Sequence, residues 1–329
     1  MLAVLVVFVM ALGVTAVSIP GIRRLAISLG FVDAPAQRKL HSTPIPLMGG
    51  VAIYLGAIVT VALFSNRVAG SITGVLIALS IVALIGLIDD RIGLPAWAKL
   101  GGQFIAFLVL LYYGIHVQLP IPAAANYAIT FFWLAGISNA INFLDNMDGL
   151  SAGVSAVAVS FMLLLAVTNG QILVSALAAA LLGSCLGFLR YNFKPAQIFM
   201  GDAGSLFLGY SLAIIGLQLR FPANSSVVTW MVPVLILGLP IFDTTLVVFS
   251  RIRRGVSPNT AGKDHISHRL VARGFSQREA VLFLYLIGGV FGLVALFVTQ
   301  ANALEAYLIG GTVAVLALYA IWRLDRVGG

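Results

Sequence analysis

Four polar residues recur at three-residue intervals in an otherwise apolar stretch near the middle of the chain: Asn139, Asn142, Asp145 and Asp148. On a helix, residues three apart are neighbours, so the pattern predicts one polar strip. Asp and Asn oxygens suit a hard divalent cation such as Mg²⁺, and residues 139–150 contain no Lys or Arg to pair with the carboxylates. The strip is a candidate metal and catalytic site. The alternative is an ordinary helix end, with Asn146 and Gly149 as turn residues.

Two adjacent carboxylates, Asp89 and Asp90, end another apolar stretch, and Lys99 follows shortly after them. Neighbouring carboxylates repel each other, so the pair is stable mainly where a cation or a proton donor lies close by. Adjacent residues on a helix face different directions, which predicts different roles for the two acids. A solvated helix end is the alternative interpretation.

A third motif, residues 199–205, reads FMGDAGS and places Asp202 just before an apolar stretch. Backbone N–H groups at a helix start, together with nearby glycines, could approach a phosphate there. A carboxylate beside a phosphate makes sense if a metal ion bridges the two groups. Phe199 could stack on a nucleobase, or could be an ordinary aromatic residue at the membrane interface.

Asp243 lies inside an apolar run that also contains Pro233 and Pro240. An ionisable residue within a membrane segment is a functional candidate by default, and prolines can interrupt the helix and expose backbone carbonyl groups to a cavity. Pairing of Asp243 with a nearby base such as Arg251 is the alternative.

Two polar loops carry most of the remaining basic groups. The first, residues 33–50, is rich in Pro and Gly and holds an anion-binding cluster that includes Lys39 and His41. The second, residues 251–270, interleaves bases with His265, His268 and Arg269, a pattern that favours a specific polyanion site. Positive charge that only orients the protein in the membrane, or that binds anionic lipid heads, is the alternative for these loops.

The elements that must position these residues are transmembrane helices. Of the 329 residues, 60% are hydrophobic and 9% are charged, with a mean hydropathy of +1.07, whereas a soluble domain carries about 25% charged residues. The sequence predicts an all-α polytopic membrane protein, a single integral domain over 1–329. The apolar runs predict eleven spans near residues 2–19, 47–64, 71–88, 100–116, 122–140, 151–168, 171–189, 203–219, 227–249, 280–298 and 303–321.

Charge predicts the orientation of these spans. With the N-terminus outside and the C-terminus cytoplasmic, 17 of the 19 bases and ten of the eleven acids fall on the inside, as the positive-inside rule requires of the bases. A transporter is expected to hold ionisable groups near the membrane midplane, so this distribution favours chemistry on a cytosolic substrate. Oxygen ligands and basic groups at one face are typical of phosphoryl transfer. A transporter or flippase for an anionic lipid remains the alternative function.

Taken together, the motifs resemble the polyprenyl-phosphate N-acetylhexosamine-1-phosphate transferase family, a glycosyltransferase family 4 type, over nearly the whole chain. The first polar loop is similar to the branch that uses UDP-N-acetylglucosamine or a related UDP-sugar. The resemblance implies attack of undecaprenyl phosphate on the sugar-linked phosphorus and release of UMP. It implies Mg²⁺, with Mn²⁺ able to substitute, at the cytoplasmic face of the inner membrane. The expected partners are the UDP-sugar, the polyprenyl phosphate and the bilayer, with no nucleic acid and with a homodimer left open.

The resemblance also implies residue roles. Asn142 and Asp202 match metal ligands, and the catalytic candidates are Asp89, Asp90, Lys99, Asp145 and Asp148. The substrate-binding candidates are Lys39, His41, Asn139, Phe199, Asp243, His265, His268 and Arg269. Within these sets, Lys99 is expected at the diphosphate, Phe199 at the uracil, and the histidine motif at the sugar phosphate.

Two positions depart from the family pattern. Ser267 stands where the histidine motif usually has a third histidine, which weakens any role assigned to that position. Asn146 stands where glycine is common. Asn can adopt the left-handed backbone conformation that glycine favours, so this change is tolerated. Because a phosphate monoester has a second pKa of about 6, the lipid phosphate is mostly dianionic at neutral pH. Direct attack is therefore favoured over a covalent Asp intermediate.

Overall fold

The protein is an all-α polytopic membrane protein, and the computed structural model describes residues 1–33, 44–64, 71–258, 260 and 262–327. Within that part of the chain, seven helices are long and apolar enough to cross a membrane, or up to eight if one bent pair is a single span. The fold class predicted from composition is confirmed. The predicted number of eleven spans and the orientation of the termini stay predictions.

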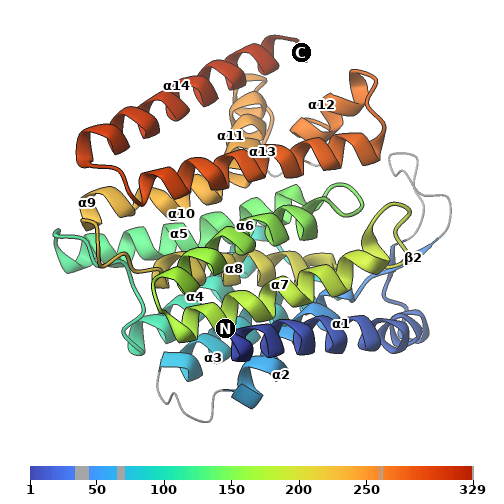
Figure 1. The fold of residues 1–329 in the computed structure, drawn as a ribbon. Coiled ribbons are helices and arrows are strands. Elements are labelled where there is room, and N and C mark those ends of the chain that lie inside the picture. The colour runs from blue at the N-terminus through green and yellow to red at the C-terminus, as the bar shows by residue number, and fades with distance from the viewer. Residues whose placement is uncertain (34–43, 65–70, 259, 261, 328–329) are drawn as a thin grey trace.

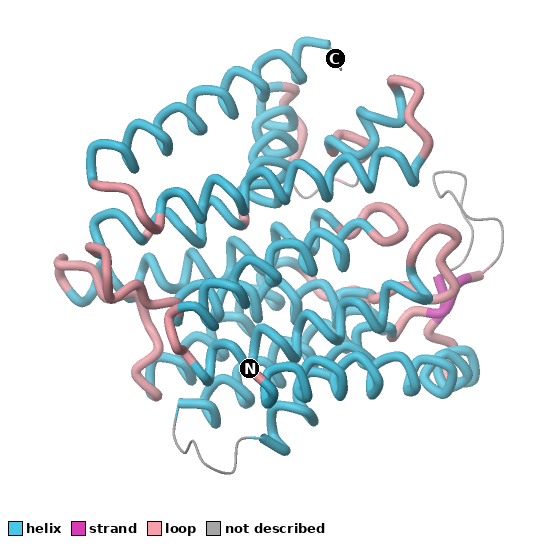
Figure 2. Tube along the Cα trace, viewed as in Figure 1, coloured by secondary structure: helices cyan, strands magenta, loops and turns pink. Residues whose placement is uncertain are grey.

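The helices form one bundle in which the long elements run roughly side by side (Figure 1). The helices are α1 (Leu2–Ser28), α2 (Gly49–Phe64), α3 (Ser71–Ile92), α4 (Ala96–Tyr112), α5 (Ala123–Leu144), α6 (Leu150–Thr168), α7 (Ile172–Asn192), α8 (Gly201–Gln218), α9 (Ser226–Thr229), α10 (Met231–Ile236), α11 (Gly238–Arg253), α12 (Ile266–Ala272), α13 (Gln277–Val298) and α14 (Ala303–Val327). In the described ranges the strands are two short ones, β1 (Val32–Asp33) and β2 (Ile45–Pro46), which pair antiparallel at one end of the bundle (Figure 2).

Helix α8 is the centre of the bundle. Every residue from Ala203 to Gly216 is buried, and α2, α3, α5 and α6 pack around the helix. Glycines allow the closest approaches at its start: a Cβ on Gly50 of α2 would lie 2.1 Å from the backbone nitrogen of Gly204, and a Cβ on Gly86 of α3 would lie 2.5 Å from the carbonyl oxygen of Asp202. These approaches bring the end of α3 and its carboxylates directly against the start of α8.

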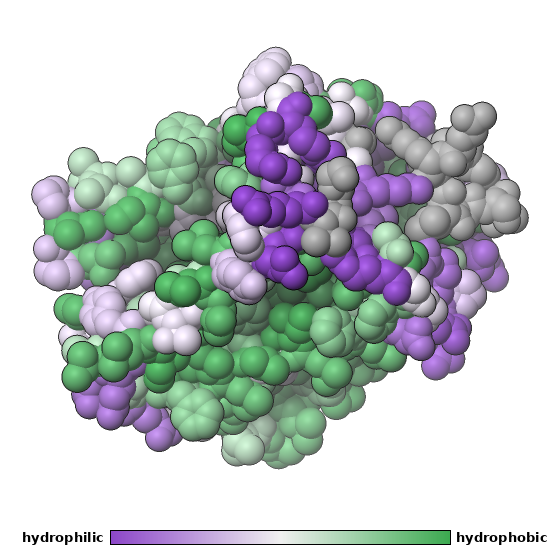
Figure 3. All heavy atoms as spheres, turned by 90° about the horizontal axis from the view of Figure 1, so that it is seen from above, coloured by the Kyte–Doolittle hydropathy of each residue, from purple (hydrophilic) through white to green (hydrophobic). Residues whose placement is uncertain are grey.

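The outer helices present apolar side chains to their surroundings. Large hydrophobic residues of α1, α4, α13 and α14 are exposed, as expected where lipid is the solvent. Seen from the side of α14, hydrophobic residues cover much of the surface, and hydrophilic residues gather most densely toward one end (Figure 3). The polar chemistry is therefore concentrated at one end of the bundle.

The predicted span at 227–249 is broken in the structure. Helices α10 and α11 meet at an angle of 70° around Leu237, between Pro233 and Pro240. Proline lacks a backbone N–H and clashes with the preceding turn, so it favours such an interruption. The break turns α11, which carries Asp243, toward α12 and away from the line of α10.

Candidate active site

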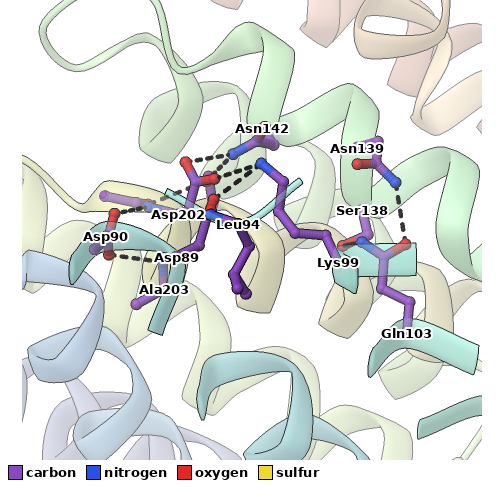
Figure 4. A network of polar contacts seen from close by, with 12 residues as sticks. Asp89, Asp90, Leu94, Lys99, Gln103, Ser138, Asn139, Asn142, Asp202 and Ala203 are labelled. Atoms are coloured by element: carbon purple, nitrogen blue, oxygen red, sulfur yellow. Dashed lines mark hydrogen bonds and ion pairs between the residues drawn. The ribbon is translucent and has the colours of Figure 1, made fainter. Parts of the chain in front are cut away.

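Lys99 joins two carboxylates that are far apart in the sequence. Its Nζ lies 2.9 Å from Oδ2 of Asp89 and 3.0 Å from Oδ2 of Asp202, so α3, α4 and α8 meet at one ammonium group (Figure 4). The second oxygen of Asp89 accepts a hydrogen bond from the backbone N–H of Leu94. All three charged side chains are at most partly exposed. A single positive charge therefore holds together two groups that would otherwise repel each other.

Asp90 points away from Asp89 and binds the start of α8. Its two oxygens accept hydrogen bonds from the backbone N–H groups of Asp202 at 2.7 Å and Ala203 at 3.1 Å (Figure 4). These are N–H groups that a helix leaves without partners in its first turn. The two adjacent acids thus have different partners: Asp89 contacts the lysine, whereas Asp90 fixes the helix that carries Asp202.

Gly201 is the residue that makes this contact possible. Its φ is +68°, and a Cβ added there would lie 2.4 Å from Oδ2 of Asp90. Gly201→Ala must therefore both adopt a left-handed conformation, which costs about 1–2 kcal/mol, and displace the Asp90 carboxylate. We expect lower stability and a loss of activity of about tenfold or more, since 1.4 kcal/mol is about tenfold in rate.

A matched control for Gly201→Ala exists in the same chain. Gly114 has a φ of +74°, and nothing lies within 4 Å of a Cβ placed on it. Gly114→Ala should lose comparable stability in a thermal unfolding measurement and keep its activity. Equal activity losses in the two variants would contradict the role given to the Asp90 contact.

Asn142 completes the cluster from the end of α5. Its side-chain nitrogen donates to Oδ1 of Asp202 at 2.9 Å and to Oγ of Ser205 at 2.8 Å. Asn139, one turn earlier, instead donates to Oε1 of Gln103 at 3.1 Å and to the carbonyl oxygen of Ala135 (Figure 4). The structure therefore brings Asn142 to Asp202, and directs Asn139 toward a buried glutamine on α4.

The predicted helical strip does not continue past Asn142. Helix α5 ends at Leu144, with Asp145 as its C-cap, and Gly149 begins α6 with a φ of +78°. The alternative interpretation, a helix end followed by a turn, is therefore correct for residues 145–149. Gly149 adopts the left-handed conformation that this turn needs before α6 begins. Asp145 and Asp148 are presented by this turn and not by one face of a helix.

Asp148 finds a base that the sequence stretch itself lacks. Its Oδ2 accepts from the backbone N–H of Ala196 at 3.0 Å and lies 3.5 Å from Nζ of Lys194. Within the ranges that the structure describes, Asp145 forms no ion pair with a Lys or Arg. Burial, and then the negative charges of Asp202, Asp90 and Asp148, raise its pKa to about 8. An added cation beside Asp145 would offset this surrounding negative charge.

A cavity of about 510 Å³ opens beside this cluster. Of the predicted site residues, those that line it are Asp90, Asp145, Asp148, Phe199, Asp202 and His268. Sequence reasoning missed several polar residues on its walls, namely Asp33, Asn146, Asn192, Lys194, Lys263 and Gln277. The other predicted residues in the described ranges do not line the cavity; they are Asp89, Lys99, Asn139, Asn142, Asp243, His265 and Arg269. Lys39 and His41 fall outside the described residues.

Phe199 is set into the cavity wall by the strand segment. Its backbone N–H donates to the carbonyl oxygen of Pro46 in β2, and its own carbonyl oxygen accepts from the N–H of Gly49 at 2.8 Å. The next pair, Gly50 and Met200, repeats the contact at 2.9 Å. The end of the first polar loop therefore fixes the aromatic ring at the cavity.

The histidine motif divides between the cavity and the protein interior. His268 lines the cavity, and burial, followed by the charges of His265 and Lys263, lowers its pKa to about 4, so its imidazole is neutral near pH 7. His265 is turned inward, with Nδ1 at 2.7 Å from Oδ2 of Asp243. The other oxygen of Asp243 accepts from the backbone N–H of Ile266 at the start of α12. Asp243 thus places α12, and with it His268.

Arg269 also holds the motif in place. Its guanidinium donates to the carbonyl oxygens of Asp264 at 2.7 Å and Leu324 at 2.5 Å, and the side chain is buried. Asp264 in turn accepts from Arg251 and Arg254. Although burial alone would raise the pKa of Asp264, these hydrogen bonds and charges keep it below its usual range. The alternative partner considered for Asp243, Arg251, pairs with Asp264 instead.

The donor set fits a hard cation bound together with a substrate. No group of three or more His, Cys, Asp or Glu side chains in the described part of the chain is placed to hold a metal ion. Mg²⁺ in phosphate-handling enzymes is usually bound by one or two carboxylates and by the phosphates of the substrate. Asp202 lines the cavity and supplies a carboxylate of that kind. Asn142 lies next to it, with its side-chain nitrogen 2.9 Å from Oδ1 of Asp202, so a half-turn of the amide would present its oxygen to the same cation.

Comparison with known proteins identifies the family. Residues 72–220 match the family described as glycosyl transferase family 4. A Bacillus subtilis protein, named probable undecaprenyl-phosphate N-acetylglucosaminyl 1-phosphate transferase, is 36% identical over 92% of this chain and 87% of its own length. The chain belongs to glycosyl transferase family 4. The resemblance seen in its motifs is confirmed.

Two further relatives of this family 4 member carry the names of related transferases. A decaprenyl-phosphate N-acetylglucosaminephosphotransferase of Mycolicibacterium smegmatis is 34% identical over 83% of the chain and 77% of its own length. A phospho-N-acetylmuramoyl-pentapeptide-transferase of Bacillus anthracis is 27% identical over 89% and 95%. The family match contains the cluster from Asp89 to Asp202 but ends before α11 and α12.

Proposed function

We propose that the protein transfers N-acetylglucosamine 1-phosphate from UDP-N-acetylglucosamine to undecaprenyl phosphate. The observation that carries the proposal is the convergence of Asp89, Lys99, Asn142 and Asp202 from four helices beside the cavity. The names of the relatives at 36% and 34% identity support the acceptor and the sugar. The product, a polyprenyl-diphosphate sugar, serves the synthesis of cell-envelope polysaccharide.

In the proposed reaction, an oxygen of the lipid phosphate attacks the phosphorus that bears the sugar. The new P–O bond forms as the bond to UMP breaks, and UMP leaves with the electron pair. Asp90 and Asp145 face the cavity where the lipid phosphate would be oriented, while the ammonium of Lys99 offsets negative charge beside Asp202. Phe199 stacks on the uracil, and neutral His268 is free to donate a hydrogen bond to the diphosphate. No covalent Asp intermediate is needed, because the acceptor is already a dianion.

Mg²⁺, or Mn²⁺ in its place, is proposed at Asp202 and Asn142, where it would neutralise phosphate charge during transfer. Asp145 lines the same cavity as Asp202 and would be a further oxygen ligand. We expect excess EDTA to reduce the activity of the purified protein to background. Added Mg²⁺ or Mn²⁺ should restore it, whereas Ca²⁺ should restore less, because its longer and more flexible coordination fits compact phosphate sites poorly. Full activity in EDTA, after prior dialysis against the chelator, would exclude the metal.

The proposed placement in the membrane has eleven crossings within one domain, residues 1–329. Helices α2, α4 and α8 would cross in addition to the long apolar ones; α2 and α4 are apolar but shorter, and α8 is shielded by its neighbours. In this placement the protein lies in the inner membrane, with its N-terminus outside and its C-terminus in the cytoplasm. The cavity then lies at the cytoplasmic face.

The deciding experiment is an incubation of purified protein with radiolabelled UDP-N-acetylglucosamine, undecaprenyl phosphate and Mg²⁺. Lipid-extractable label together with stoichiometric UMP is the expected result. Movement of a labelled lipid across vesicles without UMP release would instead support a transporter or flippase. UDP-N-acetylgalactosamine and UDP-N-acetylmuramoyl-pentapeptide serve as competing donors that test the choice of sugar.

A further inference from the structure

The two positions at which the chain departs from its family pattern contact each other. Ser267 donates from Oγ to Oδ1 of Asn146 at 2.6 Å, across 121 residues of sequence. Ser267 is fully buried. The other hydroxyl contact, with Nδ1 of His268, is longer at 3.5 Å. The serine and the asparagine thus form one side-chain pair.

This hydrogen bond joins two walls of the cavity. Asn146 lies in the turn between Asp145 and Asp148, and all three line the cavity. Ser267 does not line it, but its neighbour His268 does. The side-chain nitrogen of Asn146 donates to the carbonyl oxygen of Phe143 at 2.9 Å, which leaves its Oδ1 directed at the serine. The contact therefore sets where the imidazole stands relative to the acidic turn.

The backbone gives no other reason for asparagine at this position. Among the described residues, the non-glycine residue with a positive φ is Met48, not Asn146, so the left-handed conformation considered from the sequence does not occur. A glycine at 146 would leave the buried hydroxyl of Ser267 without its short acceptor, which is unfavourable. A histidine at 267 would need volume that the buried site and the Asn146 side chain do not leave. Each departure is thus accommodated by the other.

We propose that the Ser267–Asn146 hydrogen bond is a positioning contact that holds His268 against the acidic turn and thereby sets the affinity for the sugar-nucleotide donor. This proposal rests on the proposed function. It assigns the effect to the donor, because His268 lines the cavity and is the residue proposed to donate a hydrogen bond to the diphosphate of the donor.

The first test is a double-mutant cycle with Ser267→Ala, Asn146→Ala and the combined variant. A hydrogen bond of this kind is worth about threefold to tenfold in affinity, so each single variant should raise the KM for UDP-N-acetylglucosamine by that factor. The combined variant should raise this KM no more than the more strongly affected of the two single variants does. The kcat and the KM for undecaprenyl phosphate should change by less than about twofold in Ser267→Ala. Effects that multiply in the combined variant would overturn the proposal.

The second test exchanges the pair. Ser267→His alone should lower kcat/KM strongly, and adding Asn146→Gly to the same chain should recover much of the loss by making room for the imidazole. If Asn146→Gly brings no recovery, the two positions are not coupled and the proposal is wrong. Ser267→Cys, close to serine in volume and a weaker donor, replaces Ser267→Ala if the latter does not fold.

A control separates positioning from general stability. Ser80 pairs with the Tyr54 hydroxyl at 2.7 Å and joins α2 to α3 away from the cavity. Ser80→Ala should leave the donor KM unchanged. Calorimetric titration of each variant with UDP-N-acetylglucosamine measures donor affinity without turnover. Failure of wild-type transfer would contradict the proposed function, whereas equal donor affinity in wild type and Ser267→Ala would overturn the positioning role.

Discussion

Asp202→Asn is expected to reduce the formation of lipid-linked sugar by about 100-fold to 1,000-fold, the scale of a lost charge-stabilising group in an enzyme site. Asp202 contacts Lys99, Asn142 and, through its backbone N–H, Asp90. The neutral amide keeps the size of the side chain but removes the charge that the ammonium and the proposed metal require. The measurement is lipid-extractable label at saturating donor and acceptor.

The matched control for this variant is Glu305→Gln. Like Asp202, Glu305 is an acidic residue in the first turn of a helix, but its carboxylate accepts from the backbone N–H of Asn302, and it belongs to α14 and does not line the cavity. The Glu305→Gln variant should keep full activity and should still insert into the membrane. A normal rate in Asp202→Asn, with Glu305→Gln also normal, would remove Asp202 from the reaction.

Lys99→Met should lower kcat by about 100-fold to 1,000-fold, because removing an oriented group that stabilises charge costs this much in comparable sites. The methionine keeps the length of the aliphatic stem but leaves Asp89 and Asp202 facing each other without a cation. Loss of the ammonium leaves more negative charge at the proposed Mg²⁺ site, so half-maximal activity should need less Mg²⁺, and a titration of activity against Mg²⁺ measures that shift.

Lys99→Arg distinguishes charge from geometry. Guanidinium is planar and larger than an ammonium, whereas the lysine nitrogen fits between two oxygens at 2.9 and 3.0 Å. Partial activity is expected, above that of Lys99→Met and well below that of wild type. Wild-type kinetics in Lys99→Met would show that this ion pair serves neither binding nor turnover.

The fold class could be predicted from the sequence because it depends on bulk properties. A chain with 9% charged residues has too little polar surface for water, so long apolar runs reveal helices without any knowledge of contacts. The 70° break at Leu237 was harder to place. Pro233 and Pro240 indicate that an interruption is possible, but packing against the neighbouring helices decides where the chain turns.

The sequence predicted which residues form the site better than it predicted which of them contact each other. The motifs predict Asp89, Asn142 and Asp202 as site residues, and the structure brings Asp89 and Asp202 to one lysine and Asn142 to Asp202. Periodicity failed for Asp145, because α5 ends at Leu144 and the helical rule no longer applies. Lys194 was missed as the partner of Asp148, since pairing between distant segments leaves no signal in a single sequence.

The same limit applies to groups that turned out to face inward. His265 and Arg269 carry the chemistry expected of ligand contacts, yet Nδ1 of His265 pairs with Asp243 and the guanidinium of Arg269 donates to backbone carbonyl groups. Residue type alone does not separate a side chain that touches a substrate from one that holds its neighbour. The distinction needs the direction of each side chain, which the packing of α11, α12 and α14 determines.

The last helix is easily taken for a dispensable lipid-facing appendage, since most of α14 is exposed. Its final turns nevertheless brace the catalytic end: Leu324 receives Arg269 from the histidine segment, and Asp325 receives Arg253 from α11. The final turns of α14 therefore help to hold the helices that surround the cavity, so truncation before Leu324 would disturb the site as well as shorten the chain.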